Sequence, residues 1–131
     1  MEQNQKVEDY MRIITRLREK GTVRGAYIAR ELGVSKPTVS VALREMEAEG
    51  FLSIQPDRSV ELTEKGERLG KYVIERNDVI FGILTALGVD GKTARADACR
   101  MEHGISEESL AALKRLRQRL IQISDEKTDD H

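Results

Sequence analysis

The sequence predicts a mainly α-helical protein that contains one small β-hairpin. Apolar residues recur every three or four positions through most of the 131 residues, which is the periodicity of helices packed on a core. Only residues 51–54 and 60–62 are extended in character, and the residues between them are typical of a turn. The composition, with 34% charged and 39% apolar residues, agrees with a helix-rich globular protein.

The first helix is expected over residues 7–19 and ends at Gly21. Asp9 lies in its first turn, and Arg12 follows one turn later on the same side. Side chains three positions apart on a helix are neighbours, so a surface ion pair between Asp9 and Arg12 is the simplest interpretation of their spacing.

Residues 26–46, AYIARELGVSKPTVSVALREM, predict two short helices joined by a tight turn. Gly33 can end the first helix without a steric penalty. Ser35 is a suitable N-cap for the second helix, and Pro37 lies in its first turn, where no backbone N–H is needed. The outward face of the second helix is short, polar and cationic, and consists of Lys36, Thr38, Ser40, Val41 and Arg44. Such a helix, entered from its N-terminus, fits the DNA major groove.

The charge balance supports DNA binding only locally. The net charge of the chain is −1. Between residues 22 and 44, however, Glu31 is the single acid, against the cations Arg24, Arg30, Lys36 and Arg44. An ordinary helical hairpin is the alternative interpretation, and the compact turn and the acid-free outward face argue against it.

A predicted β-hairpin follows the two short helices, with strands at 51–54 and 60–62. A helix-turn-helix followed by such a hairpin is a winged helix. Arg58, at the hairpin tip, would then be placed for a phosphate or for the minor groove. A solvated turn arginine is an equally simple interpretation of Arg58.

Three further helices are expected, at residues 64–87, 92–103 and 107–123. Their apolar residues exceed what one small winged domain can cover, and two-fold dimers are the commonest oligomers, so pairing with a second copy is the economical explanation. We therefore expect a winged helix-turn-helix DNA-binding domain over residues 1–63 and an α-helical dimerisation and metal-binding domain over residues 64–124. A charged, disordered tail is expected over residues 125–131.

Several classes of protein are disfavoured by the sequence. No apolar run approaches the ~20 residues of a membrane span, and the N-terminus has no apolar core like that of a signal peptide. A single cysteine allows no internal disulfide. Nucleophile-elbow, phosphate-loop and HExxH motifs are absent. We expect a cytoplasmic protein that is not an enzyme, contacts no membrane and takes no small organic substrate.

Cys99, Glu102 and His103 lie at positions i, i+3 and i+4 of a predicted helix, so they would project from about one face. Thiolate, carboxylate and imidazole together suit a divalent transition metal. The alternative is that the three residues share this spacing by chance, because a cysteine in a helix usually acts as a small apolar residue. A catalytic zinc with an open position is a third interpretation, and no other motif supports it.

Four segments, VEDY, IARELGVSKPTVS, DRSVELTEKG and DACRMEHGIS, occur in this order along the chain. With them the chain resembles the diphtheria toxin repressor family of iron- and manganese-dependent transcriptional repressors. It is similar to the shorter manganese transport regulators in stopping before a third, SH3-like domain. The resemblance implies that a divalent metal links the first helix to the dimerisation domain. A homodimer then binds a palindromic operator in double-stranded DNA and represses metal-uptake genes.

The resemblance also implies individual site residues. The implied metal ligands are Asp9, Cys99, Glu102 and His103. The implied DNA contacts are Ser35, Pro37, Thr38 and Ser40, with Val41 where relatives often have a glutamine. One divalent metal is expected per subunit. A thiolate favours Fe²⁺, while Mn²⁺, Zn²⁺, Co²⁺ and Ni²⁺ are the alternatives.

The chain departs from the family where relatives place a second metal. Family donors are matched here by Arg12, Asn77, Phe81 and Arg95, so the second metal site is expected to be absent. Arg12 and Arg95 instead place fixed cations there as substitutes for a metal.

Two interpretations of Arg12 follow from this departure. Arg12 pairs with Glu102 or Asp78 and holds the DNA-binding arrangement, or it pairs only with Asp9. The alternative function is accordingly a winged-helix regulator that has lost metal dependence and is locked by Arg12, or one that senses redox state through Cys99.

Overall fold

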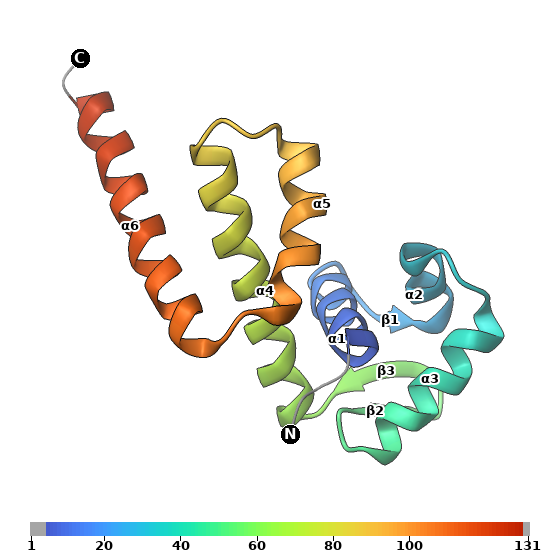
Figure 1. Ribbon diagram of the computed structural model, residues 1–131. Coiled ribbons are helices and arrows are strands. Elements are labelled where there is room, and N and C mark those ends of the chain that lie inside the picture. The colour runs from blue at the N-terminus through green and yellow to red at the C-terminus, as the bar shows by residue number, and fades with distance from the viewer. Residues whose placement is uncertain (1–4, 130–131) are drawn as a thin grey trace. The chain divides into compact units, whose positions relative to one another are not determined.

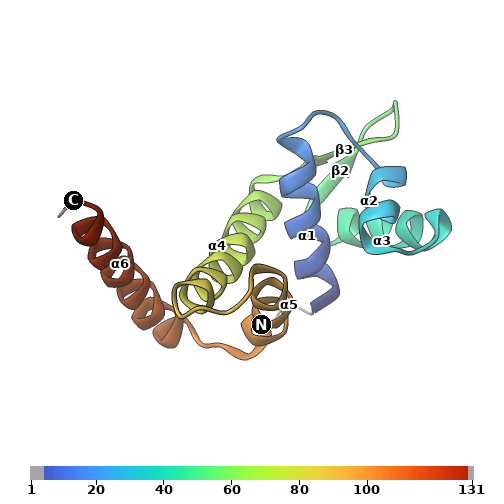
Figure 2. The same ribbon diagram turned by 90° about the horizontal axis from the view of Figure 1, so that it is seen from above.

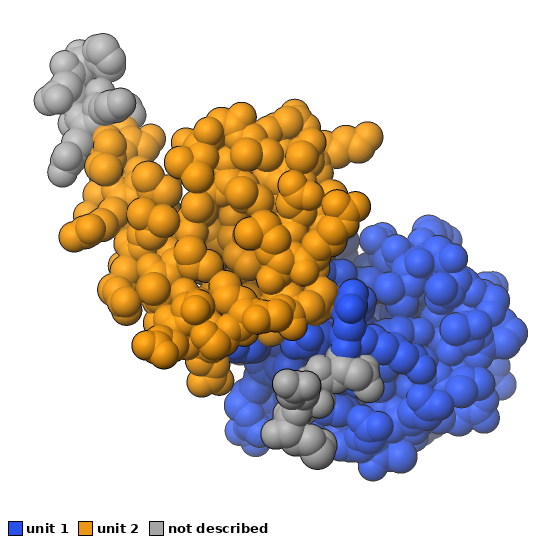
Figure 3. Space-filling model, in the orientation of Figure 1, with its two compact units in different colours: residues 1–73 blue, residues 74–131 orange. Residues whose placement is uncertain are grey.

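The structure is a computed structural model that describes residues 5–129 (Figure 1). The chain divides into two compact units, residues 1–73 and residues 74–131 (Figure 3), and each unit is described by itself. The described residues are mainly helical and include one small antiparallel sheet. The predicted fold class, a winged helix-turn-helix followed by a helical domain, is confirmed. None of the described helices is both long and apolar enough to span a bilayer.

Unit 1 contains the helix-turn-helix and the sheet. Its elements are α1 (Gln5–Arg18), β1 (Val23–Arg24), α2 (Gly25–Leu32), α3 (Lys36–Ala48), β2 (Leu52–Ile54), β3 (Ser59–Leu62) and the first part of α4 (Glu64–Ala86). The division between the units falls inside α4, after Val73, whereas the sequence placed a domain boundary between residues 63 and 64.

The sheet of unit 1 has the strand order β1-β3-β2, and both pairs are antiparallel. β2 and β3 form the predicted hairpin, with Leu52 opposite Leu62 and Ile54 opposite Val60. Figure 2 shows the loop between β2 and β3 projecting from the body of unit 1. β1, expected only as an extended link, pairs with β3 and so ties the segment ahead of α2 to the wing.

The turn between α2 and α3 has the predicted capping chemistry. Gly33 adopts the left-handed region with φ of 69°, and its N–H donates to Ala29 O. Ser35 Oγ accepts a hydrogen bond from Thr38 N at 3.2 Å, and Pro37 lies in the first turn of α3. Because both sides of the turn are capped, α3 begins at a defined residue.

Two glycines let α4 lie close to the rest of unit 1. A Cβ at Gly66 would meet Phe51 O at 2.0 Å, and a Cβ at Gly70 would meet Thr15 Oγ1 at 2.1 Å. The start of α4 is therefore packed against α1 and against the residue that precedes β2. The side chains buried in unit 1 come from every element of it, and include Met11, Ile14, Ile28, Val39 and Leu52.

Unit 2 contains the rest of α4, then α5 (Gly91–Met101), a 3-10 turn (Glu102–Gly104) and α6 (Glu107–Asp129). In both views α5 and α6 flank α4 (Figures 1 and 2). The buried apolar residues of unit 2 include Val79, Ile80, Ala94, Ala98 and Leu110. Further along α6, Leu116, Ile121 and Ile123 are exposed by 43%, 48% and 51%. Unit 2 thus presents apolar surface that the described residues leave open.

Two helix ends differ from the expectation. α5 ends at Met101, so Glu102 and His103 lie in the 3-10 turn rather than in a continuous helix. α6 continues to Asp129, although a disordered tail was expected from residue 125. Charged residues such as Glu and Lys are good helix formers, so charge alone does not end a helix. Residues 130 and 131 lie outside the described part of the chain.

Candidate nucleic-acid interface and metal centre

The outward face of α3 and the wing tip carry the predicted DNA contacts. All nine predicted residues are exposed: Arg24, Ser35, Lys36, Pro37, Thr38, Ser40, Val41, Arg44 and Arg58. Val39, Leu43 and Met46 are buried in the core of unit 1. α3 therefore has a buried apolar stripe and an outward face without acids before Glu45.

The cations of this face surround one recess, which we call the cationic recess. Arg24, Lys36, Arg44 and Arg58 line it together with Ser40, and its volume is about 620 Å³. Among the described residues, no acidic side chain lines it. Arg44 is held along α3, because its Nη2 donates to Ser40 Oγ at 3.4 Å. Four cations around a concave surface attract a polyanion such as a nucleic-acid backbone.

Arg24 has a partner that the sequence did not suggest. Its Nη1 donates to Asp57 O at 2.9 Å, and its Nη2 lies 3.8 Å from Asp57 Oδ2. Asp57 Oδ1 also accepts from Ser59 Oγ at 2.6 Å and from Ser59 N at 2.9 Å. The hydrogen bonds from Ser59, and then the charge of Arg24, hold the pKa of Asp57 below its ordinary value of 3.8. Arg24 is therefore attached to the wing tip.

In unit 2 the structure brings Glu102 and His103 together. Glu102 is fully buried, and its Oε1 lies 3.7 Å from His103 Nε2. Among the described residues of unit 2, the Cys99 sulfur does not join this close donor group. It accepts a hydrogen bond from Asn77 Nδ2 at 3.4 Å instead. Glu102 and His103 lie in the 3-10 turn that follows α5, and the joining of Cys99 to them stays a prediction.

The chemistry of Glu102 and His103 fits a divalent transition metal. A carboxylate that is buried from water is unfavourable unless a cation or hydrogen-bond donors face it. Carboxylate and imidazole are ligands for zinc, iron(II) and manganese, and a thiolate would soften the set.

Asp9 and Arg12 lie on α1 of unit 1. Arg12 Nη2 is 3.3 Å from Asp9 Oδ1, so the predicted ion pair within this helix is confirmed. The other candidate metal ligands belong to unit 2. The joining of Asp9 to them therefore stays a prediction, as does a pairing of Arg12 with Glu102.

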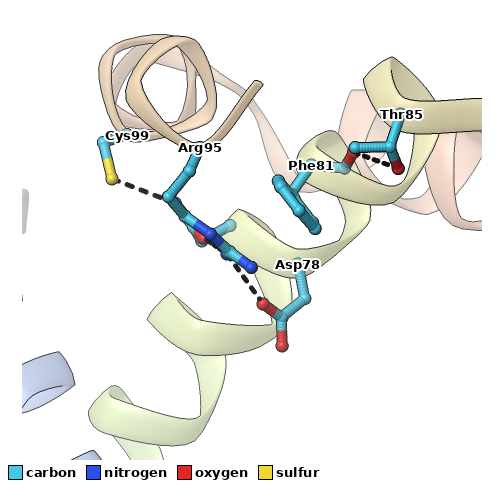
Figure 4. Close-up of polar contacts among 6 residues, drawn as sticks. Asp78, Phe81, Thr85, Arg95 and Cys99 are labelled. Carbon is cyan, nitrogen blue, oxygen red and sulfur yellow. Dashed lines mark hydrogen bonds and ion pairs between the residues drawn. The ribbon is translucent and has the colours of Figure 1, made fainter. Parts of the chain in front are cut away.

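Arg95 is the centre of a polar cluster between α4 and α5 (Figure 4). Its Nη1 donates to Asn77 Oδ1 and to Asp78 Oδ1, the latter at 3.2 Å, and its guanidinium lies 3.7 Å from the centroid of the Phe81 ring. Asn77 accepts from Arg95 through its oxygen and donates to Cys99 through its nitrogen. Arg95 thus contacts Asn77 and Phe81, two of the other three positions at which the chain departs from family donors. Asp78, one of the partners expected for Arg12, pairs with Arg95.

The sequence did not predict the contacts that Asp57 and Asn77 make. Asp57 stands two positions before Ser59 in a turn, which is the spacing of an Asx-turn, so this signal was available. No sequence signal pairs Asn77 with Cys99, because the two residues are 22 positions apart and meet only through the packing of α4 and α5.

Comparison with known proteins covers both units. Residues 3–60 match the family described as iron dependent repressor, N-terminal DNA binding domain. Residues 63–122 match the family described as iron dependent repressor, metal binding and dimerisation domain.

Individual relatives agree with these matches. The transcriptional regulator MntR of Escherichia coli O157:H7 is 40% identical over 109 residues, which cover 82% of this chain and 70% of the relative. The diphtheria toxin repressor of Corynebacterium efficiens is 36% identical over 123 residues, which cover 92% of this chain and 50% of that longer relative.

Solved structures show the same fold. The structure of the manganese regulator SloR is similar with a TM-score of 0.74 and 25% identity, covering 88% of this chain and 54% of that one. A manganese-dependent transcriptional repressor in complex with manganese gives a TM-score of 0.77 at 23% identity, covering 86% and 52%.

Proposed function

Because this chain belongs to the iron-dependent repressor family, we propose that it is a metal-dependent transcriptional repressor which binds a palindromic operator as a homodimer and controls genes of metal-ion homeostasis. Family members are transcriptional regulators and not enzymes. The observation that carries the proposal is the presence in one chain of the cationic recess of unit 1 and of the buried Glu102–His103 pair of unit 2.

In this proposal α3 enters the major groove and the wing approaches the DNA backbone. The exposed hydroxyls of Thr38 and Ser40 serve base edges or phosphates, and the Val41 methyl groups meet a thymine methyl. Lys36 and Arg58 neutralise phosphates. A palindromic operator follows from two-fold symmetry, since two copies of α3 then address two equivalent half-sites.

The proposed metal site takes one divalent transition metal per subunit. Glu102 and His103 hold it, with Cys99 from unit 2 and Asp9 from unit 1 completing the set. Asp9 and Cys99 enter from the sequence resemblance. The metal supplies positive charge to a buried carboxylate and a coordination link between elements far apart in sequence. Fe²⁺ is favoured by the thiolate, and Mn²⁺ becomes the better candidate if Cys99 stays on Asn77.

Arg95 takes the place of a second metal in this proposal. A guanidinium stays protonated at all physiological pH values and can hold two oxygen acceptors at once. Here it joins Asn77 and Asp78 of α4 to α5 and stacks on Phe81. A permanent cation of this kind stabilises the α4–α5 pair whether or not metal is available. Arg12 places another fixed cation on α1, where it pairs with Asp9 of the same helix.

A fluorescence-anisotropy titration tests the function. The wild-type chain is titrated onto duplexes selected from a random pool, in chelator and in excess Mn²⁺, Fe²⁺ or Co²⁺. We expect binding to be at least about tenfold tighter with one of these metals, and the gain to disappear in His103→Ala. Equal affinities with chelator and with each metal would exclude metal control.

One observation favours a second candidate. The Cys99 sulfur accepts a hydrogen bond from Asn77 rather than joining Glu102 and His103, which suits a thiol that senses oxidation. In that case peroxide would release DNA in the presence of chelator, and Cys99→Ser would abolish the response. DNA release by peroxide only in the metal-loaded protein would instead indicate that Cys99 is a metal ligand.

A further inference from the structure

The wing tip of unit 1 is held in one conformation by hydrogen bonds within its turn. Gln55 N donates to Ser59 O at 2.9 Å, and Arg58 N donates to Gln55 O at 2.8 Å. Asp57 Oδ1 accepts from both the backbone and the hydroxyl of Ser59. The turn therefore has a fixed carboxylate at its apex, although Asp57 itself is exposed.

The residue after this carboxylate has an unusual backbone. Among the described residues, Arg58 is the one non-glycine residue with positive φ, at 70°. This region is disfavoured for residues with a Cβ and is kept only where the surroundings determine the conformation. Arg58 is one of the residues that line the cationic recess, together with Lys36 and Arg44.

Arg24 contacts the wing tip from outside the turn. It lies on β1, opposite Ser59 in the sheet register, and its guanidinium reaches both the backbone oxygen and the carboxylate of Asp57. Its charge is opposed by Asp57, and its guanidinium is already engaged with two oxygens of that residue. Arg24 is therefore less available to a phosphate than an arginine without such contacts.

We propose that Arg24 is a positioning residue: it clamps Asp57, and the clamp holds the wing so that Arg58 addresses the DNA backbone. This inference rests on the proposed DNA binding. Arg58 makes the direct contact with DNA. Arg24 and Asp57 act together, and only through the position of Arg58.

For the removal of Asp57, the clamp predicts a change in DNA affinity opposite to the one that simple electrostatics predicts. Removing an acid from a surface that faces a polyanion ordinarily strengthens binding. If Asp57 anchors the wing, its removal weakens binding, because Arg58 loses its fixed position. Glu61 is the matched control, since it is an exposed acid on β3 of the same wing and lies outside the clamp.

The experiment uses the full chain with saturating Mn²⁺ and a fluorescein-labelled duplex of mixed sequence, titrated at several salt concentrations. We expect Asp57→Ala and Arg24→Ala each to weaken binding about three- to tenfold, and Glu61→Ala to leave it unchanged or slightly tighter. Asp57→Asn, which keeps an acceptor for Ser59 but loses the charge facing Arg24, should fall between wild type and Asp57→Ala.

A double-mutant cycle separates positioning from direct contact. In an Arg58→Ala background, Arg24→Ala should have no further effect, and only Arg58→Ala should lower the salt slope by about 1. Asp57→Ala binding as tightly as Glu61→Ala would overturn the clamp. So would additive effects of Arg24 and Arg58, each with its own change in salt slope.

Amide hydrogen exchange gives a readout that does not need DNA. The Arg58 and Ser59 amides should exchange several-fold faster in Arg24→Ala than in wild type, with the amides of α3 unchanged. Unchanged exchange at the wing would contradict the clamp even if DNA binding fell. The proposed function would be contradicted instead if the Arg58 and Ser59 amides exchange faster in Arg24→Ala, as expected, but the wild-type chain binds no DNA.

Discussion

The two units differ in how far their own residues bury their apolar side chains. Unit 1 has a closed core, a turn capped on both sides and two glycines that bring α4 against its neighbours. Unit 2 joins α4 to α5 through the Arg95 cluster, holds a buried carboxylate next to an imidazole, and leaves apolar residues of α6 exposed. The helix-turn-helix of unit 1 is therefore fixed by contacts within that unit, whereas unit 2 has both a buried carboxylate and open apolar surface, the two features on which the proposed metal binding and pairing depend.

The strongest way to break this comparison is to spoil the packing of unit 1. In Gly66→Ala the new Cβ would lie 2.0 Å from Phe51 O, and backbone cannot move aside as a flexible side chain can. We expect unit 1 to lose about 3 kcal/mol or more of unfolding free energy, measured by calorimetry as a separate early transition. Gly91→Ala is the control, because nothing lies within 4 Å of a Cβ there. Equal midpoints for the two variants would show that α4 is not closely packed in unit 1.

The second prediction affects unit 2 and spares unit 1. His103→Ala removes the imidazole beside the buried Glu102 carboxylate, so Mn²⁺ and Co²⁺ affinity should fall about 100-fold or more in a calorimetric titration. The melting of unit 1 should not change. Asp97→Ala, which removes an acid on α5 that pairs with Arg100, should bind metal normally. Loss of affinity in Asp97→Ala as well would mean that the acids of α5 bind metal unspecifically.

The third prediction concerns the fixed cation of unit 2. Arg95→Ala removes an ion pair, a hydrogen bond and a ring contact, so we expect unit 2 to lose about 1–2 kcal/mol of unfolding free energy with chelator present. Arg100→Ala on the same helix removes a pair that is largely exposed, and should change stability by less than about 0.5 kcal/mol. A second metal bound by the wild-type chain would contradict the idea that Arg95 substitutes for it.

The smallest expected effect is the pH dependence of unit 1. The hydrogen bond from Arg18, and then its charge, hold the pKa of Glu67 below its ordinary value of 4.5. A depressed carboxyl pKa stabilises the fold above the unfolded pKa, and this contribution is lost as pH falls through the folded pKa. Glu67→Gln should therefore melt slightly earlier than wild type at pH 7 and together with it below about pH 3. If the difference in melting temperature between Glu67→Gln and wild type grew toward low pH, the prediction would be contradicted.

Local signals made most of the fold predictable. Gly33, Ser35 and Pro37 identify the helix-turn-helix because caps act on their nearest neighbours in sequence. The turn residues between β2 and β3 identify the wing in the same way. The end of α5 at Met101 was missed because no Gly or Pro marks it before Gly104. The extent of α6 was missed because a charged segment is typical of both a solvated helix and a disordered tail.

The sites were less predictable than the fold, because their contacts join distant segments. The sequence proposed Cys99, Glu102 and His103 as one donor set, but gave no sign that Asn77 donates a hydrogen bond to the Cys99 sulfur. Arg24 was expected to contact DNA, and its contact with Asp57, 33 positions away, depends on the pairing of β1 with β3. Composition and spacing carry no information about such pairings.

The central claim is that metal binding in unit 2 and DNA binding by unit 1 are coupled. Thermodynamic linkage requires that whatever factor metal adds to DNA affinity, DNA adds to metal affinity. The direct measurement is a calorimetric titration of Mn²⁺ or Fe²⁺ into the free protein and into its complex with a selected operator duplex. We expect one metal per chain and a metal affinity about 10- to 100-fold higher in the complex. Equal metal affinities with and without DNA would contradict it.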